Sequence, residues 1–245
     1  MNSIEIKNLS KNFKERKAVE NLSLSVKSNT VFGLLGQNGA GKTTTIKMLC
    51  GLLEPSSGDA FIEGKSILTE SRDVKRLIGI SPQETATAKK LTVFENLEFI
   101  AKIYGAKSGE AKEKSLEMLS HFSLSDRAKD KASSLSGGMA RKLSIAMALI
   151  NEPKVLFLDE PTLGLDVRAR RELWRVIEEL KGKMTVVLTT HYLEEAEALC
   201  DEIAIMGGGK LRAFGKAKEL TRKSGQKSFE DAFLFFTESE KEEIL

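Results

Sequence analysis

A glycine-rich segment near residue 40 constrains the fold of this chain more than any other feature. It has the pattern G-x-x-x-x-G-K-T, and it stands between an apolar run at residues 31–35 and a helical pattern with Ile46, Leu49 and Leu53. A strand, a glycine loop and a helix in this order form a phosphate-binding loop, whose backbone N–H groups and helix amino terminus face an anion. The chain is therefore predicted to bind a nucleoside triphosphate, and the loop residues are Gly36, Gln37, Asn38, Gly39, Ala40, Gly41, Lys42, Thr43 and Thr44.

Four polar residues near this loop have the chemistry of phosphoryl transfer. Lys42 can reach the β- and γ-phosphates, and the Thr43 hydroxyl can ligate Mg²⁺. The apolar residues 155–158 end in Asp159 and Glu160. This pattern places Asp159 at the carboxyl end of a buried strand beside the loop, where it can hold Mg²⁺ through water. Glu160 can polarise a water molecule for attack on the γ-phosphate.

Composition limits the remaining classes of function. The formal net charge of +3 does not indicate a polyanion binder, and the basic residues between Lys11 and Lys17 are expected to form a solvated connection between two strands. Cys50 and Cys200 are expected to be buried free thiols, as in a reducing compartment. No apolar run approaches the roughly 20 residues that cross a bilayer, and the polar start is unlike a signal peptide. We therefore expect a soluble chain, for which a membrane role would need a partner.

The hydrophobic pattern predicts an α/β fold. Residues 1–27 alternate in hydrophobicity like half-buried strands. Residues 155–158, 186–188 and 203–205 are instead continuous apolar runs, which are typical of parallel strands buried on both faces. The expected fold is a phosphate-loop NTPase core with a mostly parallel central sheet, an N-terminal antiparallel β portion and an inserted helical subdomain.

The insert is expected at residues 84–150, which lack a convincing strand. Thr92 and Glu95 have the spacing of a capping box that starts a helix, and two more helical patterns begin near Ala111 and Gly138. The order of the chain thus predicts one domain, residues 1–245, with a nucleotide-binding core at 1–83 and 151–220, a helical subdomain at 84–150 and a C-terminal helical tail at 221–245.

The C-terminal tail has three phenylalanines on one helical face, Phe229, Phe233 and Phe236. A partner-binding helix would show the same pattern. We favour a tail helix that packs on its own core.

The segment Leu-Ser-Gly-Gly-Met at residues 135–139 opens the third helical pattern of the insert. Alone, such a segment is usually a helix N-cap. Here it stands between the phosphate loop and the strand that ends in two carboxylates, and all three in this order are improbable by chance. In this combination the chain resembles the ATP-binding subunit of an ABC transporter over nearly its whole length. The cofactors that this resemblance implies are ATP and Mg²⁺.

The resemblance implies roles for four further residues. Phe13 corresponds to the aromatic residue that stacks on adenine, usually a tyrosine, and it keeps the π-face. Gln83 matches the glutamine that contacts Mg²⁺ and the attacking water and faces the membrane partner. His191 matches the histidine that contacts the γ-phosphate, whereas His121 is expected to be structural. Asp166 matches the aspartate through which two active sites communicate.

The resemblance also implies a head-to-tail dimer. The signature segment is expected to lie too far from its own phosphate loop to complete that site, so Ser136, Gly137 and Gly138 of one copy would cap the ATP of the other. Two identical copies are expected, and pairing with a related subunit stays open. Met139 stands where glutamine is commonest and Leu163 where serine is common, so the coupling between sites is the less secure part of the resemblance.

Three kinds of ABC protein stay open. Residues 91–97, 139–144 and 229–233 resemble the ABC-2 exporter type, which includes antibiotic-resistance and sodium-extrusion ATPases. The alternatives are an importer ATPase subunit and a soluble ABC ATPase that acts on ribosomes or DNA. For the exporter we expect a polytopic membrane permease as partner, no nucleic acid, and a cytoplasmic location on the inner face of the cell membrane.

Overall fold

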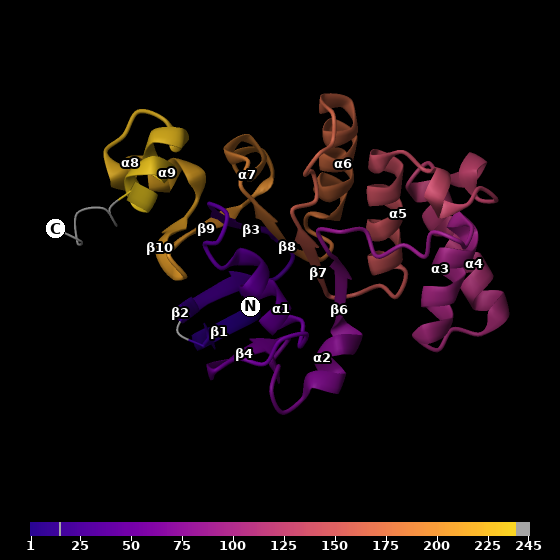
Figure 1. Cartoon of the computed structure of the whole chain (residues 1–245), viewed down its shortest axis with the longest axis horizontal. Coiled ribbons are helices and arrows are strands. Elements are labelled where there is room, and N and C mark those ends of the chain that lie inside the picture. Colours follow the sequence, from indigo (N-terminus) through magenta and orange to yellow (C-terminus); the bar gives the residue numbers. More distant parts are fainter. Residues whose placement is uncertain (15, 239–245) are drawn as a thin grey trace.

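The computed structural model describes residues 1–14 and 16–238, and its centre is a six-stranded sheet (Figure 1). The strand order is β10-β9-β3-β8-β7-β6, and every neighbouring pair is parallel except β9 with β10. Because β3 lies between β8 and β9, the phosphate loop that follows it leaves the middle of the sheet. The strands are β3 (Val31–Gly36), β6 (Ile78–Ser81), β7 (Val155–Asp159), β8 (Thr185–Thr190), β9 (Glu202–Gly207) and β10 (Lys210–Gly215).

A second, antiparallel sheet is formed mainly by the N-terminal part of the chain, in the order β2-β1-β4-β5. Its strands are β1 (Asn2–Phe13), β2 (Arg16–Lys27), β4 (Ser57–Ile62) and β5 (Lys65–Ser66). The expected connection between Lys11 and Lys17 is wrong, because Lys11 pairs with Val19 and Phe13 with Arg16. Charged side chains project into solvent from the strands of this hairpin while its backbone groups stay paired, so a basic cluster did not require a loop.

Helices cover both faces of the central sheet (Figure 1). Helix α1 (Lys42–Leu49) packs between the two sheets, with Ile46 in one core cluster with Phe32 and Val187. Helices α6 (Val167–Leu180) and α7 (Leu193–Leu199) lie on the opposite face, where Ile177 packs with Leu156 and Leu188. Alternate residues of each buried strand thus face different helices, which explains their continuous apolar runs.

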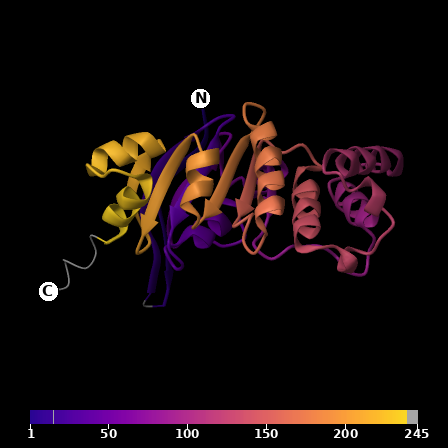
Figure 2. The same ribbon diagram turned by 90° about the horizontal axis from the view of Figure 1, so that it is seen from above.

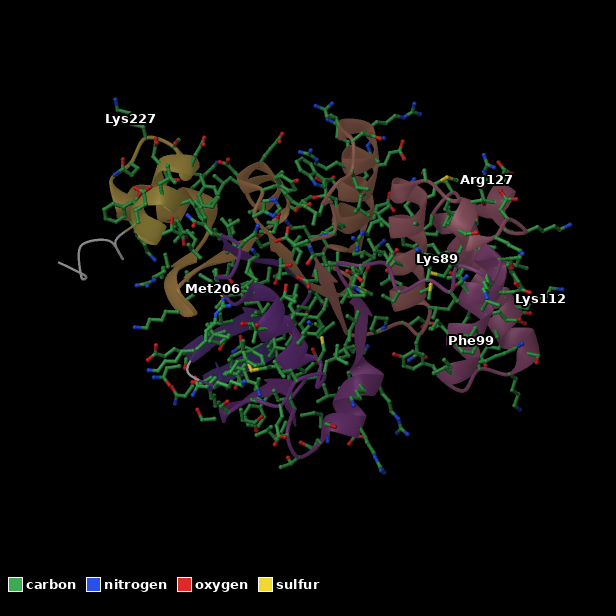
Figure 3. All side chains as sticks on the ribbon, viewed as in Figure 1. Lys89, Phe99, Lys112, Arg127, Met206 and Lys227 are labelled. Atoms are coloured by element: carbon green, nitrogen blue, oxygen red, sulfur yellow. The ribbon has the colours of Figure 1, made fainter. Side chains whose placement is uncertain are left out.

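The helical insert extends from one end of the sheet (Figure 2). It contains α3 (Val93–Ile103), α4 (Ser108–His121) and α5 (Gly137–Leu149), and its described residues contain no strand longer than one isolated bridge. The predicted capping box is present: Thr92 Oγ1 accepts from Glu95 N at 3.1 Å, and Glu95 Oε2 accepts from Thr92 N at 2.7 Å. Charged side chains such as Lys112 and Arg127 lie on the outer side of the insert (Figure 3).

The C-terminal helices pack against the end of the sheet that carries β9 and β10. They are α8 (Ala217–Ser224) and α9 (Phe229–Glu238), and Phe229 and Phe233 share a core cluster with Leu35 and Ile205. The expected packing of this tail on its own core is therefore confirmed within the described residues. No helix in residues 1–14 and 16–238 combines the length and the apolar composition needed to cross a bilayer.

The predicted fold class is confirmed. The sequence patterns gave no indication of β4, β5, β6 or α2 (Ser71–Leu77). The helix after the phosphate loop is also shorter than its apolar pattern indicates, because it ends at Leu49, and Leu53 packs against the core from the following turn.

Candidate functional site

The phosphate loop leaves β3 and turns sharply into α1. Gly39 and Gly41 have φ angles of 85° and 102°, a region that favours glycine. A Cβ atom on Gly41 would lie 2.6 Å from the carbonyl oxygen of Ala18, so this position also lacks room for a side chain. The fully buried strand before the loop and the helix after it fix the loop at the amino terminus of α1, where backbone N–H groups and the helix dipole favour an anion.

A pocket of about 610 Å³ opens at this loop. It contains residues from five separate segments: the β1–β2 hairpin, the loop itself, the segment after β6, the segment after β7 and the end of β8. Its lining residues are Phe13, Arg16, Ala18, Gln37, Asn38, Gly39, Ala40, Gly41, Lys42, Thr43, Thr44, Gln83, Glu160, Leu163 and His191.

Three predicted catalytic residues meet on one side of this pocket. Lys42 Nζ donates to the Gly36 carbonyl at 2.7 Å and lies 3.3 Å from Glu160 Oε1, with both charged side chains nearly buried. The other Glu160 oxygen, Oε2, is 2.8 Å from His191 Nδ1. Glu160 thus bridges a lysine and a histidine, and bound phosphates would compete with it for both.

Asp159 is fixed at the end of β7 by two hydroxyl groups. Thr189 Oγ1 of the neighbouring strand donates to Asp159 Oδ1 at 2.6 Å, and Thr43 Oγ1 donates to the same oxygen at 3.1 Å. Thr189 Oγ1 also accepts from the backbone N–H of Glu160 at 2.9 Å. One threonine therefore holds the carboxylate of Asp159 and the backbone of Glu160.

The donor set around Asp159 fits Mg²⁺. The hydroxyl of Thr43 and the carboxylate of Asp159 are hard oxygen ligands in contact with each other at the phosphate loop. Among the described residues, no three His, Cys, Asp or Glu side chains group as a metal cluster. Two protein oxygens are nevertheless what Mg²⁺ at a nucleotide requires, because phosphates and water supply its other ligands.

Gln83 is held in the pocket wall by a buried arginine that the sequence analysis missed. Arg141 of α5 donates through Nη1 to the Pro82 carbonyl at 2.6 Å and through Nη2 to the Gln83 carbonyl. Burial lowers the pKa of Arg141, whereas the nearby Asp159 charge acts in the opposite direction. Helix α5 also carries the signature segment at its start, so this arginine joins that helix to the segment at Gln83.

Six predicted site residues lie outside the pocket lining. Gly36 and Asp159 lie directly behind it and bond to the lining residues Lys42 and Thr43. The other four, Ser136, Gly137, Gly138 and Asp166, belong to the starts of α5 and α6. Ser136 caps α5 by accepting from Met139 N at 3.3 Å, and Asp166 caps α6 by accepting from Ala169 N at 2.9 Å. A Cβ atom on Gly138 would lie 3.0 Å from Ala169 Cβ, so the starts of these two helices lie side by side. Within one chain, the signature segment and the nucleotide pocket are separate surfaces.

Three residues near the site have no motif that the sequence analysis could use: Arg16, Thr189 and Arg141. The Arg16 guanidinium approaches the loop, with Nη2 3.4 Å from the position of a Cβ on Gly39. The parallel register pairs Asp159 with Thr189, so the position of that threonine follows from the strand order alone.

Residues 19–163 match the family model described as ABC transporter. The chain is 42% identical to the linearmycin resistance ATP-binding protein of Bacillus subtilis (strain 168), an alignment that covers 91% of this chain and 72% of the relative. It is 40% identical to a daunorubicin resistance ATP-binding protein of Streptomyces coeruleorubidus, over 91% of this chain and 71% of that one. It is also 43% identical to the human phospholipid-transporting ATPase ABCA3, of which it spans only 13%.

Solved structures are similar as well. One is described as the ATP-binding subunit of an ABC transporter. It superposes with a TM-score of 0.85 at 31% identity, over 95% of this chain and 98% of that one.

Proposed function

The chain belongs to the ABC transporter family as an ATP-binding subunit that hydrolyses ATP, and from this membership we propose that it dimerises on MgATP and powers a separate membrane permease of the ABC-2 exporter type. The names of its relatives support the exporter class, because two relatives whose alignments cover 91% of this chain are named as resistance proteins for linearmycin and daunorubicin. The inner face of the cell membrane is the location that this function requires.

The separation of the signature segment from the pocket is the observation that carries the dimer. Ser136, Gly137 and Gly138 begin a helix whose amino terminus favours an anion, yet none of them lines the pocket of its own chain. A two-fold axis between two copies would place each signature segment over the phosphate loop of the other. Asp166, beside the signature segment at the start of α6, would then lie near the contact between the two copies.

The pocket residues have defined roles in this proposal. Phe13, which is 46% exposed at the rim, stacks on adenine, and the backbone and Lys42 hold the phosphates. Thr43, Asp159 and Gln83 hold Mg²⁺, which neutralises charge on the phosphates when bound. His191 contacts the γ-phosphate.

Glu160 accepts a proton from the attacking water in this proposal. In the structure its two carboxylate oxygens contact Lys42 and His191. When phosphates take these two partners, both carboxylate oxygens of Glu160 are released, and one of them can accept the proton from the water.

A second groove, of about 650 Å³, is suited to the permease. It lies between the core and the helical insert, where Leu52, Ile103 and Tyr104 expose apolar surface beside the charged Lys75 and Arg76. A short amphipathic helix with apolar and acidic side chains matches this surface. Gln83 lies in the nucleotide pocket instead, so the groove beside the insert does not include it.

A pull-down tests the permease. Tagged Glu160→Gln is incubated with MgATP in detergent-solubilised native cells, with Lys42→Ala as a control that cannot hold nucleotide. A polytopic membrane protein that is recovered with the first variant and not with the second supports the proposal. Ribosomal proteins in its place would assign the chain to the soluble class of ABC ATPases.

A further inference from the structure

Three buried side-chain atoms of the described residues lack a hydrogen-bond partner. Within residues 1–14 and 16–238, the buried side-chain atoms without a partner are Thr162 Oγ1, Arg170 Nε and Glu195 Oε2. They come from the loop after Glu160, from α6 and from α7. Buried polar atoms are normally satisfied, so these three require an explanation. Two of them lie near each other, because Thr162 and Glu160 both act on the carboxyl group of Glu195.

Glu195 is the most deeply buried of these three residues. It is fully buried on the first turn of α7, four residues after His191. Its Oε1 accepts from Trp174 Nε1 of α6 at 3.1 Å, whereas Oε2 is the unpartnered atom. Burial raises the pKa of Glu195 and the charge of Glu160 adds to this, while the nearby Thr190, Thr162 and Trp174 groups act in the opposite direction.

Helix α6 contacts the histidine segment at a second point. The Arg170 guanidinium lies 5.1 Å from the centre of the Tyr192 ring, and that ring lies 4.2 Å from the His191 ring. The two contacts of α6, through Trp174 and through Arg170, both reach the residues just after His191. Because α6 begins at the Asp166 cap, they connect these residues with the loop at 160–166. His191 is thus attached to this loop through its direct bond to Glu160 and through the surroundings of Glu195.

We propose that Glu195 is a positioning residue that couples the loop at residues 160–166 to His191. The Thr162 hydroxyl already lies beside the Glu195 carboxyl, without full hydrogen-bond geometry. When His191 leaves Glu160 for the γ-phosphate, the first turn of α7 and the loop move together, and this hydroxyl donates to Glu195 Oε2. Thr162 Oγ1 and Glu195 Oε2 are then hydrogen-bonded to each other when nucleotide is bound. This inference depends on the roles of Glu160 and His191 in the proposed function.

Steady-state hydrolysis and MgATP affinity of the full chain test the coupling. Glu195→Ala and Thr162→Val each remove one side of the new hydrogen bond, so each should lower kcat about 10-fold, the worth of one ordinary hydrogen bond. The Kd for MgATP should stay within about twofold of the wild type, because neither residue lines the pocket. The double variant should be no slower than the slower single variant, since both act through one bond.

A conservative variant and a control separate positioning from stability. Glu195→Gln keeps an acceptor oxygen and should recover kcat to within about threefold of the wild type. Ser115→Ala removes another buried hydroxyl, which donates to Ala111 O at 2.7 Å in α4. It should lower the melting temperature and leave kcat unchanged.

Three results would overturn the inference. They are a wild-type kcat in Thr162→Val, a Glu195→Ala variant that is less stable but equally fast, and a Glu195→Gln variant as slow as Glu195→Ala. If Glu195→Ala does not fold, Thr162→Val decides the question. Fast turnover in Glu160→Gln would contradict the proposed function, on which this coupling rests. Slow turnover in Glu160→Gln together with a wild-type kcat in Thr162→Val would contradict the coupling alone, so the two failures are distinguishable.

Discussion

Replacing Thr189 by valine removes one hydroxyl that holds the carboxylate of Asp159 and the backbone of Glu160. Thr189 is fully buried, and its Oγ1 bonds to Asp159 Oδ1 at 2.6 Å and to the backbone N–H of Glu160 at 2.9 Å. Valine has nearly the same shape and suits a strand, so the substitution changes hydrogen bonding and little else. The change therefore isolates the energetic contribution of this hydroxyl.

The expected loss is about 2–4 kcal/mol of unfolding free energy. A hydrogen bond to a charged group contributes about 1.5–3 kcal/mol, and a buried donor left without a partner costs about 1–3 kcal/mol. Both effects occur in one network and are not fully additive. For a domain of this size the melting temperature should fall by roughly 4–16 °C.

Urea denaturation of the variant and of a matched control measures this loss. Thr185 stands on the same strand and is equally buried, but its hydroxyl only accepts from the backbone N–H of Asn29 at 3.0 Å. Thr185→Val should therefore cost about 1 kcal/mol. A Thr189→Val variant that is no less stable than Thr185→Val would refute the view that this hydroxyl organises the carboxylates.

Three further predictions concern other buried groups. Lys42→Ala should abolish MgATP binding in calorimetry, because it removes the charge that faces the phosphates, and tight residual affinity would contradict the pocket assignment. Burial raises the pKa of Glu195 above the ordinary 4.5, so its carboxyl group holds a proton more tightly in the folded than in the unfolded chain. The unfolding free energy of the wild type should therefore fall relative to that of Glu195→Gln as pH rises from 4.5, and a difference independent of pH would refute this. Burial also raises the pKa of the Cys50 and Cys200 thiols, so an alkylating reagent at pH 8 should label neither in the native chain and both in urea, and rapid native labelling would be the contrary result.

Local patterns in the sequence were sufficient for much of the fold. The phosphate loop, the capping box at Thr92 and the continuous apolar strands each depend on neighbouring residues, and the structure contains all of them. The strand β6 (Ile78–Ser81) was missed because four residues give no clear period, and it forms only by pairing with β7. The hairpin from β1 to β2 was placed wrongly because its charged tip resembles a loop in composition.

The site, too, has a part that the sequence could predict and a part that it could not. Asp159, Glu160 and His191 end neighbouring parallel strands or lie one residue beyond, so the sheet order brings them together near Lys42. The contacts of Arg141 and Glu195 could not be predicted, because they join elements far apart in the chain and depend on how helices pack. The place of Ser136 outside the pocket agrees with the expected distance from its own phosphate loop, but the partner that would use it is a proposal.

The most direct test of the account is a comparison of the wild type with Glu160→Gln in MgATP, by mass in solution and by ATP turnover. The account predicts that the variant binds ATP, accumulates as a pair of 27.0 kDa chains and hydrolyses ATP at least about 10²-fold more slowly, as expected for loss of a general base. Near-normal turnover in the variant would contradict the assignment of Glu160. A variant that binds ATP and stays at the mass of one chain would contradict the dimer.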